Sequence, residues 1–449
     1  MAHMQYDKII ARLNDPVLEN RLAAAKEVGE LIRGGKITRV ATEEVNNHIH
    51  TTYSFSPYEP AMAAFRAWQA GLQIVGSIDH DSISAAEEMM AAGREIGIAT
   101  TVGFEVRCSF LATELRDKKI NNPDSKGIVY MCVHGVPAQH IEKVKEFLRP
   151  VNRIRNVRNQ AEVERLNDLI ATTGLELIDF EKDVAALSRA GEDGSITERH
   201  ILSAFAQKII DHCGKGPGVV EFLESKLNLA VTGKIKGILS DENNPHYLYD
   251  LLGILKGSYL PQFFIQPDIE ETIPARDVVA FGLEIGAIPA YAYLGDVTES
   301  PTGDKKAEHF EDSFLDELFE TLVAIGYPAV TYMPPRNSLE QLKRVQSLAK
   351  DHMMMEISGV DINSSRQQFN CKELLMSEFS HLIDSAWALV AHEKLSTIDN
   401  KYGLFCEDNP FASETLSDRI ARYAAYGKKM DPNRPEDIIK LVTGVMSDE

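Results

Sequence analysis

The chain is poor in cysteine and lacks the cysteine pairs that build disulfide frameworks or zinc modules. Its five cysteines are scattered, with no CxxC pair: Cys108, Cys132, Cys213, Cys371 and Cys406. This pattern indicates reduced thiols in a cytoplasmic protein. No window approaches the ~20 uninterrupted apolar residues of a membrane helix. The first residues, MAHMQYDKII, lack the basic and then apolar pattern of a secretory signal. We therefore expect a cytoplasmic protein that does not cross a membrane.

Positive charge is also scarce, with 47 lysines and arginines against 67 aspartates and glutamates and a net charge of -20. A surface this acidic repels polyphosphate backbones, so a long nucleic acid is not an expected partner. The acidic charge is still compatible with a small anionic substrate in a locally positive, metal-lined pocket. It is also compatible with a homo-oligomer. The hydrophobic content of 44% is ordinary for a globular protein.

Internal repeats and low-complexity segments are absent from the sequence, and its organisation follows from alternating apolar runs. Strand and helix patterns alternate over 45–140 and again over 271–370, which predicts parallel βαβ units in two parts of one α/β barrel. Between them, 141–270 is helix-rich and charged, as expected of an insertion or cap. Residues 1–44 and 371–449 are expected to be helical extensions.

Two histidines lie one residue apart in NNHIHTTYSFS, at His48 and His50. In a β-strand, side chains two positions apart point to the same face, so both imidazoles can meet at one point. Imidazole is a common metal ligand. The alternative for this motif alone is a pair of hydrogen-bonded structural histidines.

Further ligand-type residues end other apolar strand runs. Asp79 and His80 follow LQIVGSI, Glu105 follows IATTVGF, His134 ends GIVYMCVH, and Asp361 follows MMMEISGV. The carboxyl ends of parallel barrel strands converge on one face. Singly, the aspartates could be helix N-caps and His134 a core imidazole. Together they predict one or two divalent ions, of Zn, Mn or Fe type, with Glu105 able to bridge two ions.

These motifs resemble, in order and spacing, those of the PHP (polymerase and histidinol phosphatase) family. The resemblance covers about residues 44–370 and rests on HIH at 48–50, IDHDS at 78–82, GFEVR at 103–107, VHG at 133–135 and GVDIN at 359–363. ITERHI at 196–201, after an arginine-rich helix, also resembles the insertion of nucleotide-hydrolysing members. The resemblance implies a distorted (β/α)7 TIM-like barrel that holds two or three ions and hydrolyses phosphoesters.

The resemblance also implies roles for individual residues. One ion would be held by four side chains: His48, His50, Glu105 and Asp361. A second ion would be held by Glu105 and His134, and His80 would belong to a third site.

The sequence departs from the family pattern at three places. Tyr293 stands where members carry a ligand histidine, Asn363 replaces the histidine of an Asp-x-His motif, and Ser56-Pro57 replaces an acidic turn. We therefore expect one or two ions, with Tyr293 and Asn363 as weaker candidate ligands and Asp296 as a substitute.

An anionic substrate needs cationic or hydrogen-bonding side chains. The candidates are Arg107, Arg199, His200 and Arg366, followed by Arg155, Arg158 and Arg336, while Tyr53 and Ser54 could shape the pocket. Any one of these arginines could instead be solvated or paired with an acidic residue.

The leading interpretation is a metal-dependent hydrolase of a small phosphomonoester or nucleotide-like phosphoester that uses a metal-activated hydroxide. Arg199 would stabilise charge on the phosphoryl oxygens, and Asp79 or His80 would carry the proton. One alternative is amidohydrolase-like cleavage of a C–N or C–O bond with Tyr293 as the oxyanion donor. The other is a catalytically impaired barrel that binds a metal or ligand.

Overall fold

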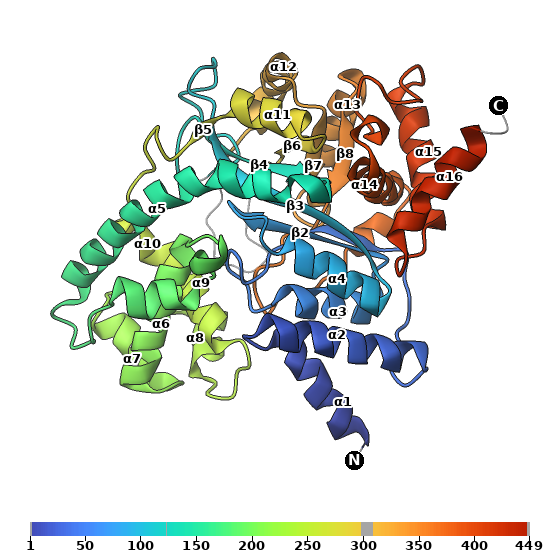
Figure 1. The fold of residues 1–449 in the computed structure, drawn as a ribbon. Coiled ribbons are helices and arrows are strands. Elements are labelled where there is room, and N and C mark those ends of the chain that lie inside the picture. Colours follow the sequence, from blue (N-terminus) through green and yellow to red (C-terminus); the bar gives the residue numbers. More distant parts are fainter. Residues whose placement is uncertain (1, 123, 298–308, 447–449) are drawn as a thin grey trace.

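The computed structural model describes residues 2–122, 124–297 and 309–446 and shows a curled α/β sheet wrapped by helices (Figure 1). Neighbouring strands follow the path β1-β2-β3-β4-β6-β7-β8, and the short β5 pairs with β3. The strands are β1 (Val45–Ile49), β2 (Ile74–His80), β3 (Ala99–Ser109), β4 (Ile128–His134), β5 (Ile273–Pro274), β6 (Ile288–Ala292), β7 (Ala329–Tyr332) and β8 (Met355–Ser358). Most strand residues are buried because the sheet is covered on both sides.

The two ends of this path meet beside the HxH motif. After β8, Ile362 donates its N–H to the carbonyl of His48 and accepts the N–H of His50. The Asn46 side chain bonds the backbone of Val360 as both donor and acceptor, and thereby bridges the same gap. Gly359 is required here, because a Cβ on it would lie 2.5 Å from the Cβ of His48. The segment that carries Asp361 is therefore held against the strand that carries both histidines.

The direction of β4 corrects the expectation of uniformly parallel βαβ units. β4 runs antiparallel to both β3 and β6, whereas β1, β2 and β3, and separately β6, β7 and β8, pair in parallel as predicted. The connection over residues 110–127 contains turns and bends but no helix among the described residues, so it does not make a crossover. The end of β4 at His134 consequently lies beside Gly103 rather than beyond Glu105.

Helices surround the sheet, and further helices lie near both termini of the chain (Figure 1). The helices of the layer around the sheet are α3 (Pro60–Gln69), α4 (Ala86–Ile96), α11 (Ala275–Glu284), α12 (Leu315–Ile325) and α13 (Leu339–Asp351). Those near the termini are α1 (Ala2–Ala11), α2 (Leu18–Arg33), α14 (His381–Ile398), α15 (Leu416–Lys429) and α16 (Ile439–Met446). α14 is almost fully buried, so the C-terminal segment is part of the main core.

A second hydrophobic core lies in a helical cap beside the sheet (Figure 1). The cap helices are α5 (Ile141–Ile170), α6 (Glu198–Cys213), α7 (Pro217–Ser225), α8 (Gly233–Ser240), α9 (Tyr247–Ser258) and α10 (Leu260–Phe263). α5 belongs to both cores: Val144 and Leu148 pack in the main core, and Val163 and Leu166 in the cap core. Across the described part of the chain, none of the helices combines the length and apolarity needed to cross a membrane.

Candidate metal centre

Three predicted ligand histidines converge around one carboxylate oxygen of Glu105, and Asp361 lies beside them. Oε2 of Glu105 lies 3.1 Å from Nδ1 of His80, 3.6 Å from Nε2 of His48 and 3.7 Å from Nε2 of His50. Nε2 of His50 also lies 3.2 Å from Oδ1 of Asp361. The side chains come from β1 and the residue after it, from β2 and β3, and from the segment after β8, so residues far apart in the sequence form one cluster.

The spacing and bonding of these atoms fit a transition metal ion. Two nitrogen or oxygen ligands of a tetrahedral ion, each about 2.1 Å from it, lie about 3.4 Å apart. The separations of His48 and His50 from Oε2 of Glu105 are close to this value and too long for good hydrogen bonds. Among the described residues, neither Nε2 atom has a hydrogen-bond partner, although both are buried. Unpaired buried polar atoms are costly, and a cation would satisfy both of them.

A chain of hydrogen bonds turns His50 toward the cluster. Asp79, 1% exposed, accepts the N–H of Thr51 at 2.7 Å and the hydroxyls of Thr51 and Ser54 at 2.6 Å each. Since Ser54 donates to Asp79, its oxygen is free to accept Nδ1–H of His50, at 3.2 Å. The proton on Nδ1 leaves a lone pair on Nε2, the atom that faces Asp361 and Glu105.

The protonation states of Glu105, Asp361 and His80 suit cation binding. Burial alone would raise the pKa of Glu105, but the neighbouring His80, His48 and His50 outweigh it and hold the pKa at about 2. The same contest between burial and the imidazoles keeps the pKa of Asp361 well below its usual range. Burial lowers the pKa of His80 to about 3. At neutral pH the two carboxylates are therefore charged and His80 is neutral, as metal ligands must be.

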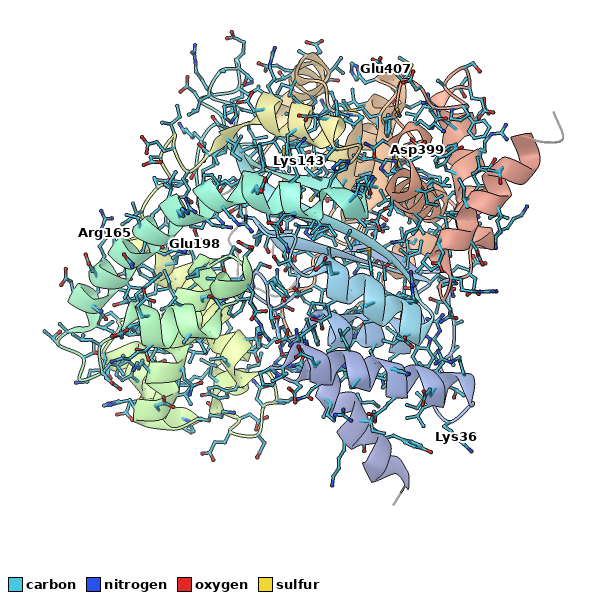
Figure 2. All side chains as sticks on the ribbon, in the orientation of Figure 1. Lys36, Lys143, Arg165, Glu198, Asp399 and Glu407 are labelled. Carbon is cyan, nitrogen blue, oxygen red and sulfur yellow. The ribbon has the colours of Figure 1, made fainter. Side chains whose placement is uncertain are left out.

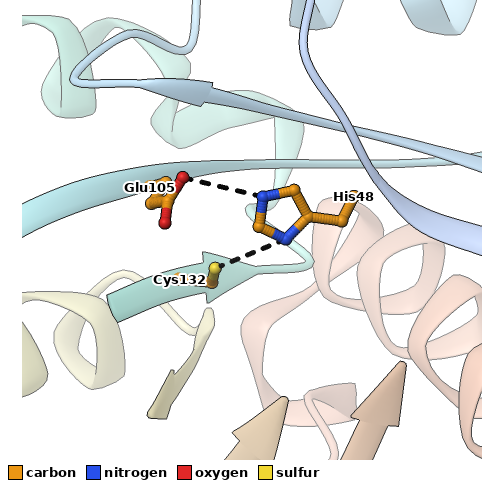
Figure 3. A group of neighbouring side chains, drawn as sticks. All are labelled: His48, Glu105 and Cys132. Carbon is orange, nitrogen blue, oxygen red and sulfur yellow. Dashed lines mark hydrogen bonds and ion pairs between the residues drawn. The ribbon is translucent and has the colours of Figure 1, made fainter. Parts of the chain in front are cut away.

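On β4, the structure brings Cys132 against the cluster. Cys132 lies directly opposite Glu105, and its Sγ is 3.9 Å from Nδ1 of His48 (Figure 3). His48, Glu105 and Cys132 lie close enough together to share an ion, as do two sets drawn from His48, His50, His80, Glu105 and Asp361. His134 is fully buried, and its Nε2 has no hydrogen-bond partner among the described residues.

Sequence reasoning did not single out Cys132, because the cysteines were treated only as scattered thiols. The available signal was strand alternation, which places Cys132 and His134 on the same face of β4. Choosing between them requires the register with β3, which no local pattern gives.

Asn363 and Arg199 form the rim of the cluster beside Asp361. The amide of Asn363 donates to Oδ1 of Asp361 at 2.7 Å, and its oxygen accepts a hydrogen bond from Nη1 of Arg199 at 2.8 Å. Because the carboxylate requires a donor and the guanidinium an acceptor, the amide orientation follows from its partners. Asn363 thus uses its oxygen to hold Arg199, and Arg199 brings positive charge next to Asp361.

Tyr293 and Asp296 make their contacts with a different group of residues. The hydroxyl of Tyr293 donates to Asp312 at 2.5 Å, and burial together with that carboxylate raises the pKa of Tyr293. Asp296 accepts the N–H of Phe310 at 2.6 Å and lies 2.8 Å from Nδ1 of His309. A protonated phenol bonded to a carboxylate is not available as a phenolate ligand.

Most of the other candidate substrate residues are held in ion pairs or caps. Arg107 pairs with Glu198 (labelled in Figure 2) and Glu271, within a buried network between the sheet and the cap. Arg155 and Arg158 join that network, pairing with Asp81, Glu162, Glu198 and Glu271.

The remaining candidates have other partners. His200 closes a capping box with Thr197, Arg366 pairs with Asp250, and Arg336 donates to the carbonyl of Leu294. Tyr53 donates to Glu192 at 3.3 Å. Of the predicted cationic residues, Arg199 is therefore the one that the structure places at the rim of the cluster.

Comparisons with known proteins give distant structural likenesses. No family model matches the chain, and no curated protein matches it. Among solved structures, a chain described as a "putative metal-dependent phosphoesterase" from Bifidobacterium adolescentis is similar over 73% of this chain and 91% of its own, with 18% identity and a TM-score of 0.48. An amidohydrolase from Chromobacterium violaceum, with bound sulfate and no metal, is similar over 73% and 90%, with 15% identity and a TM-score of 0.46. At this distance the reaction has to be inferred from the site itself.

Proposed function

We propose that this protein is a metal-dependent hydrolase of a small phosphoester and a divergent member of the PHP family. The observation that carries the proposal is the convergence of three imidazoles on one oxygen of Glu105, at 3.1, 3.6 and 3.7 Å, with Asp361 beside them. His48, His50, Glu105 and Asp361 would hold a Zn, Mn or Fe ion. When bound, such an ion supplies Lewis-acid activation of water and of a phosphoryl oxygen.

Other residues of the chain orient the ligand His50 and supply positive charge for the substrate. Asp79 and Ser54 hold His50 in the tautomer that presents Nε2 to the cluster. Arg199, held by Asn363, would bind the phosphoryl oxygens of the substrate through its fork of N–H donors.

We assign proton transfer to His80. Its side chain is 25% exposed, against 11% for His48 and 1% for His50, so it is the imidazole that faces the open side. Its Nδ1 lies 3.1 Å from Oε2 of Glu105, so the ring is within reach of a water or substrate bound at the cluster. Cleavage of C–N or C–O bonds with Tyr293 as oxyanion donor receives no support, because the Tyr293 hydroxyl already donates to Asp312.

The test is metal content per chain by elemental analysis, on protein purified without added metal or chelator, followed by a substrate screen. One or two transition-metal ions per chain are expected. Hydrolysis of nucleotides or sugar phosphates should exceed hydrolysis of matched carboxylic esters and amides.

His48→Ala should lose both the metal and the activity. The matched control is His381→Ala, which removes an exposed imidazole paired with Glu356 outside the cluster, and it should lose neither. A wild-type protein that neither carries nor takes up Zn, Mn or Fe would refute the proposal. Metal binding with activity only toward amides would refute the substrate class.

A further inference from the structure

Both histidines of the HxH motif have their Nδ1 atoms against another side chain and their Nε2 atoms toward Glu105. For His50 the partner of Nδ1 is the hydroxyl of Ser54, at 3.2 Å. For His48 it is the thiol of Cys132, at 3.9 Å, so the ring lies between the side chains of Glu105 on β3 and Cys132 on β4 (Figure 3). Cys132 is fully buried and is not within the mechanism described above.

In a neutral imidazole, this contact decides which ring nitrogen can bind a metal. One ring nitrogen carries the proton and the other carries the lone pair that binds a metal. If Nδ1 holds the proton, Nε2 is the ligand atom. A sulfur that accepts the Nδ1–H therefore selects the ligating tautomer, just as the oxygen of Ser54 does for His50.

We propose that Cys132 is a positioning residue of the metal site: its sulfur accepts the Nδ1–H of His48 and thereby presents Nε2 to the ion beside Glu105. The inference rests on the proposed metal site and adds a residue to it. The packing of Gly359 on the Cβ of His48 fixes the backbone end of the side chain, so the sulfur has only to set the ring.

Two substitutions separate this role from simple core packing. Cys132→Ser keeps an acceptor in the same place, whereas Cys132→Ala leaves the Nδ1–H of His48 buried without one. The matched control is Cys108→Ala, which removes an equally buried thiol from β3. Cys108 lies three residues after Glu105, so it points to the opposite face of the sheet.

The first experiment reads the tautomer in metal-free protein, by long-range ¹H–¹⁵N correlation of the His48 ring, with its signals assigned by their absence in His48→Gln. Although burial lowers it, the contacts with Cys132 and Glu105 raise the pKa of His48 above its usual value, so the spectra are recorded at a pH high enough to leave the ring neutral. Under these conditions we expect the Nδ1–H form in the wild type, in Cys132→Ser and in Cys108→Ala. In Cys132→Ala the Nε2–H form should become populated. An unchanged His48 tautomer in Cys132→Ala would overturn the proposal.

The second experiment is a Co²⁺ titration followed by absorption spectroscopy. Loss of an outer partner of a ligating histidine typically weakens metal binding about 10- to 100-fold, so Cys132→Ala should show this loss, and Cys132→Ser and Cys108→Ala should not. An intense near-ultraviolet sulfur-to-cobalt band in the wild type that is absent in Cys132→Ser would also overturn the proposal, because the thiolate would then be a direct ligand.

If the wild type takes up no Co²⁺, the proposed function fails instead. The tautomer experiment on metal-free protein still decides the role of Cys132 in that case.

Discussion

Asp79 provides a sharp test of whether a carboxylate beside the site orients a ligand or carries a proton. It is 1% exposed and accepts three hydrogen bonds, two from Thr51 and one from Ser54. In Asp79→Asn, the amide oxygen can keep two of these bonds, and the hydroxyl of Thr51 can turn to accept the third. Only the charge assistance is lost, which amounts to about 1–2 kcal/mol of folding free energy.

In Asp79→Ala, three donors lose their acceptor. Hydrogen bonds to a charged group contribute about 1.5–3 kcal/mol each, and removal of a buried carboxylate recovers part of that sum, since burial raises the pKa of Asp79. We expect a net loss of about 3–5 kcal/mol, similar to breaking a buried ion pair. Urea denaturation measures these changes, and competition with a chromophoric chelator measures metal affinity.

The two roles predict different patterns. If Asp79 orients His50 through Ser54, Asp79→Ala lowers stability and metal affinity together, while Ser54→Ala lowers metal affinity and leaves the two Thr51 bonds intact. If Asp79 carries the proton, Asp79→Asn loses kcat by about 100-fold or more, as for a general acid or base, with metal affinity unchanged. That second result would refute the orienting role.

Three further predictions concern other parts of the molecule. Arg199→Ala should raise KM for phosphoesters by about 10- to 100-fold, since it removes about 1.5–3 kcal/mol of charged hydrogen bonding, and steady-state rates on a neutral ester should not change. Burial lowers the pKa of His392 from 6.5 to about 4. As the pH falls from 6.5 to 4, the unfolded chain takes up a proton that the folded protein does not, so the free energy of unfolding should fall by about 3 kcal/mol. Urea denaturation at pH 6.5 and at pH 4 should show a smaller drop in unfolding free energy for His392→Gln than for the wild type. Equal drops would contradict this assignment. Glu88→Ala should cost about 3–5 kcal/mol by urea denaturation because it removes the two-bonded carboxylate partner of the buried Arg21 and leaves Glu59, at 3.6 Å, as its remaining carboxylate neighbour. A cost below 1 kcal/mol would show that water or Glu59 takes over the pairing.

The sequence patterns were sufficient to find most of the residues of the cluster. They were less successful in predicting the strand pairing that brings these residues together. Alternation along a strand was enough to place His48 and His50 on one side, and the ends of apolar runs were enough to find His80, Glu105 and Asp361. These are local rules, and the structure shows the expected convergence. The roles of these residues remain predictions.

The features that sequence reasoning missed depend on long-range pairing. The reversal of β4 depends on a connection without a helix, and it is what places Cys132 opposite Glu105. Asn363 was expected as a weak ligand, but its amide is used between Asp361 and Arg199, a contact set by a helix of the cap. Asp79 was considered as a proton carrier because nothing in its own strand reveals the donors on the 51–54 loop. In each case the deciding partner lies on another element.

One helix, α5, packs in both hydrophobic cores, so a bend in this helix would move the cap relative to the sheet. It contains Pro150, which removes one backbone N–H from the helix at about a third of its length. The arm beyond Pro150 is twenty residues, or about 30 Å, so a bend of roughly 10° at the proline would displace its far end by about 5 Å. The pairing of Arg155 with Asp81, one and a half turns past the proline, ties the near part of that arm to the strand that carries His80. A small angular change at this point would therefore be amplified toward the far end of the cap, away from the strands of the candidate metal centre.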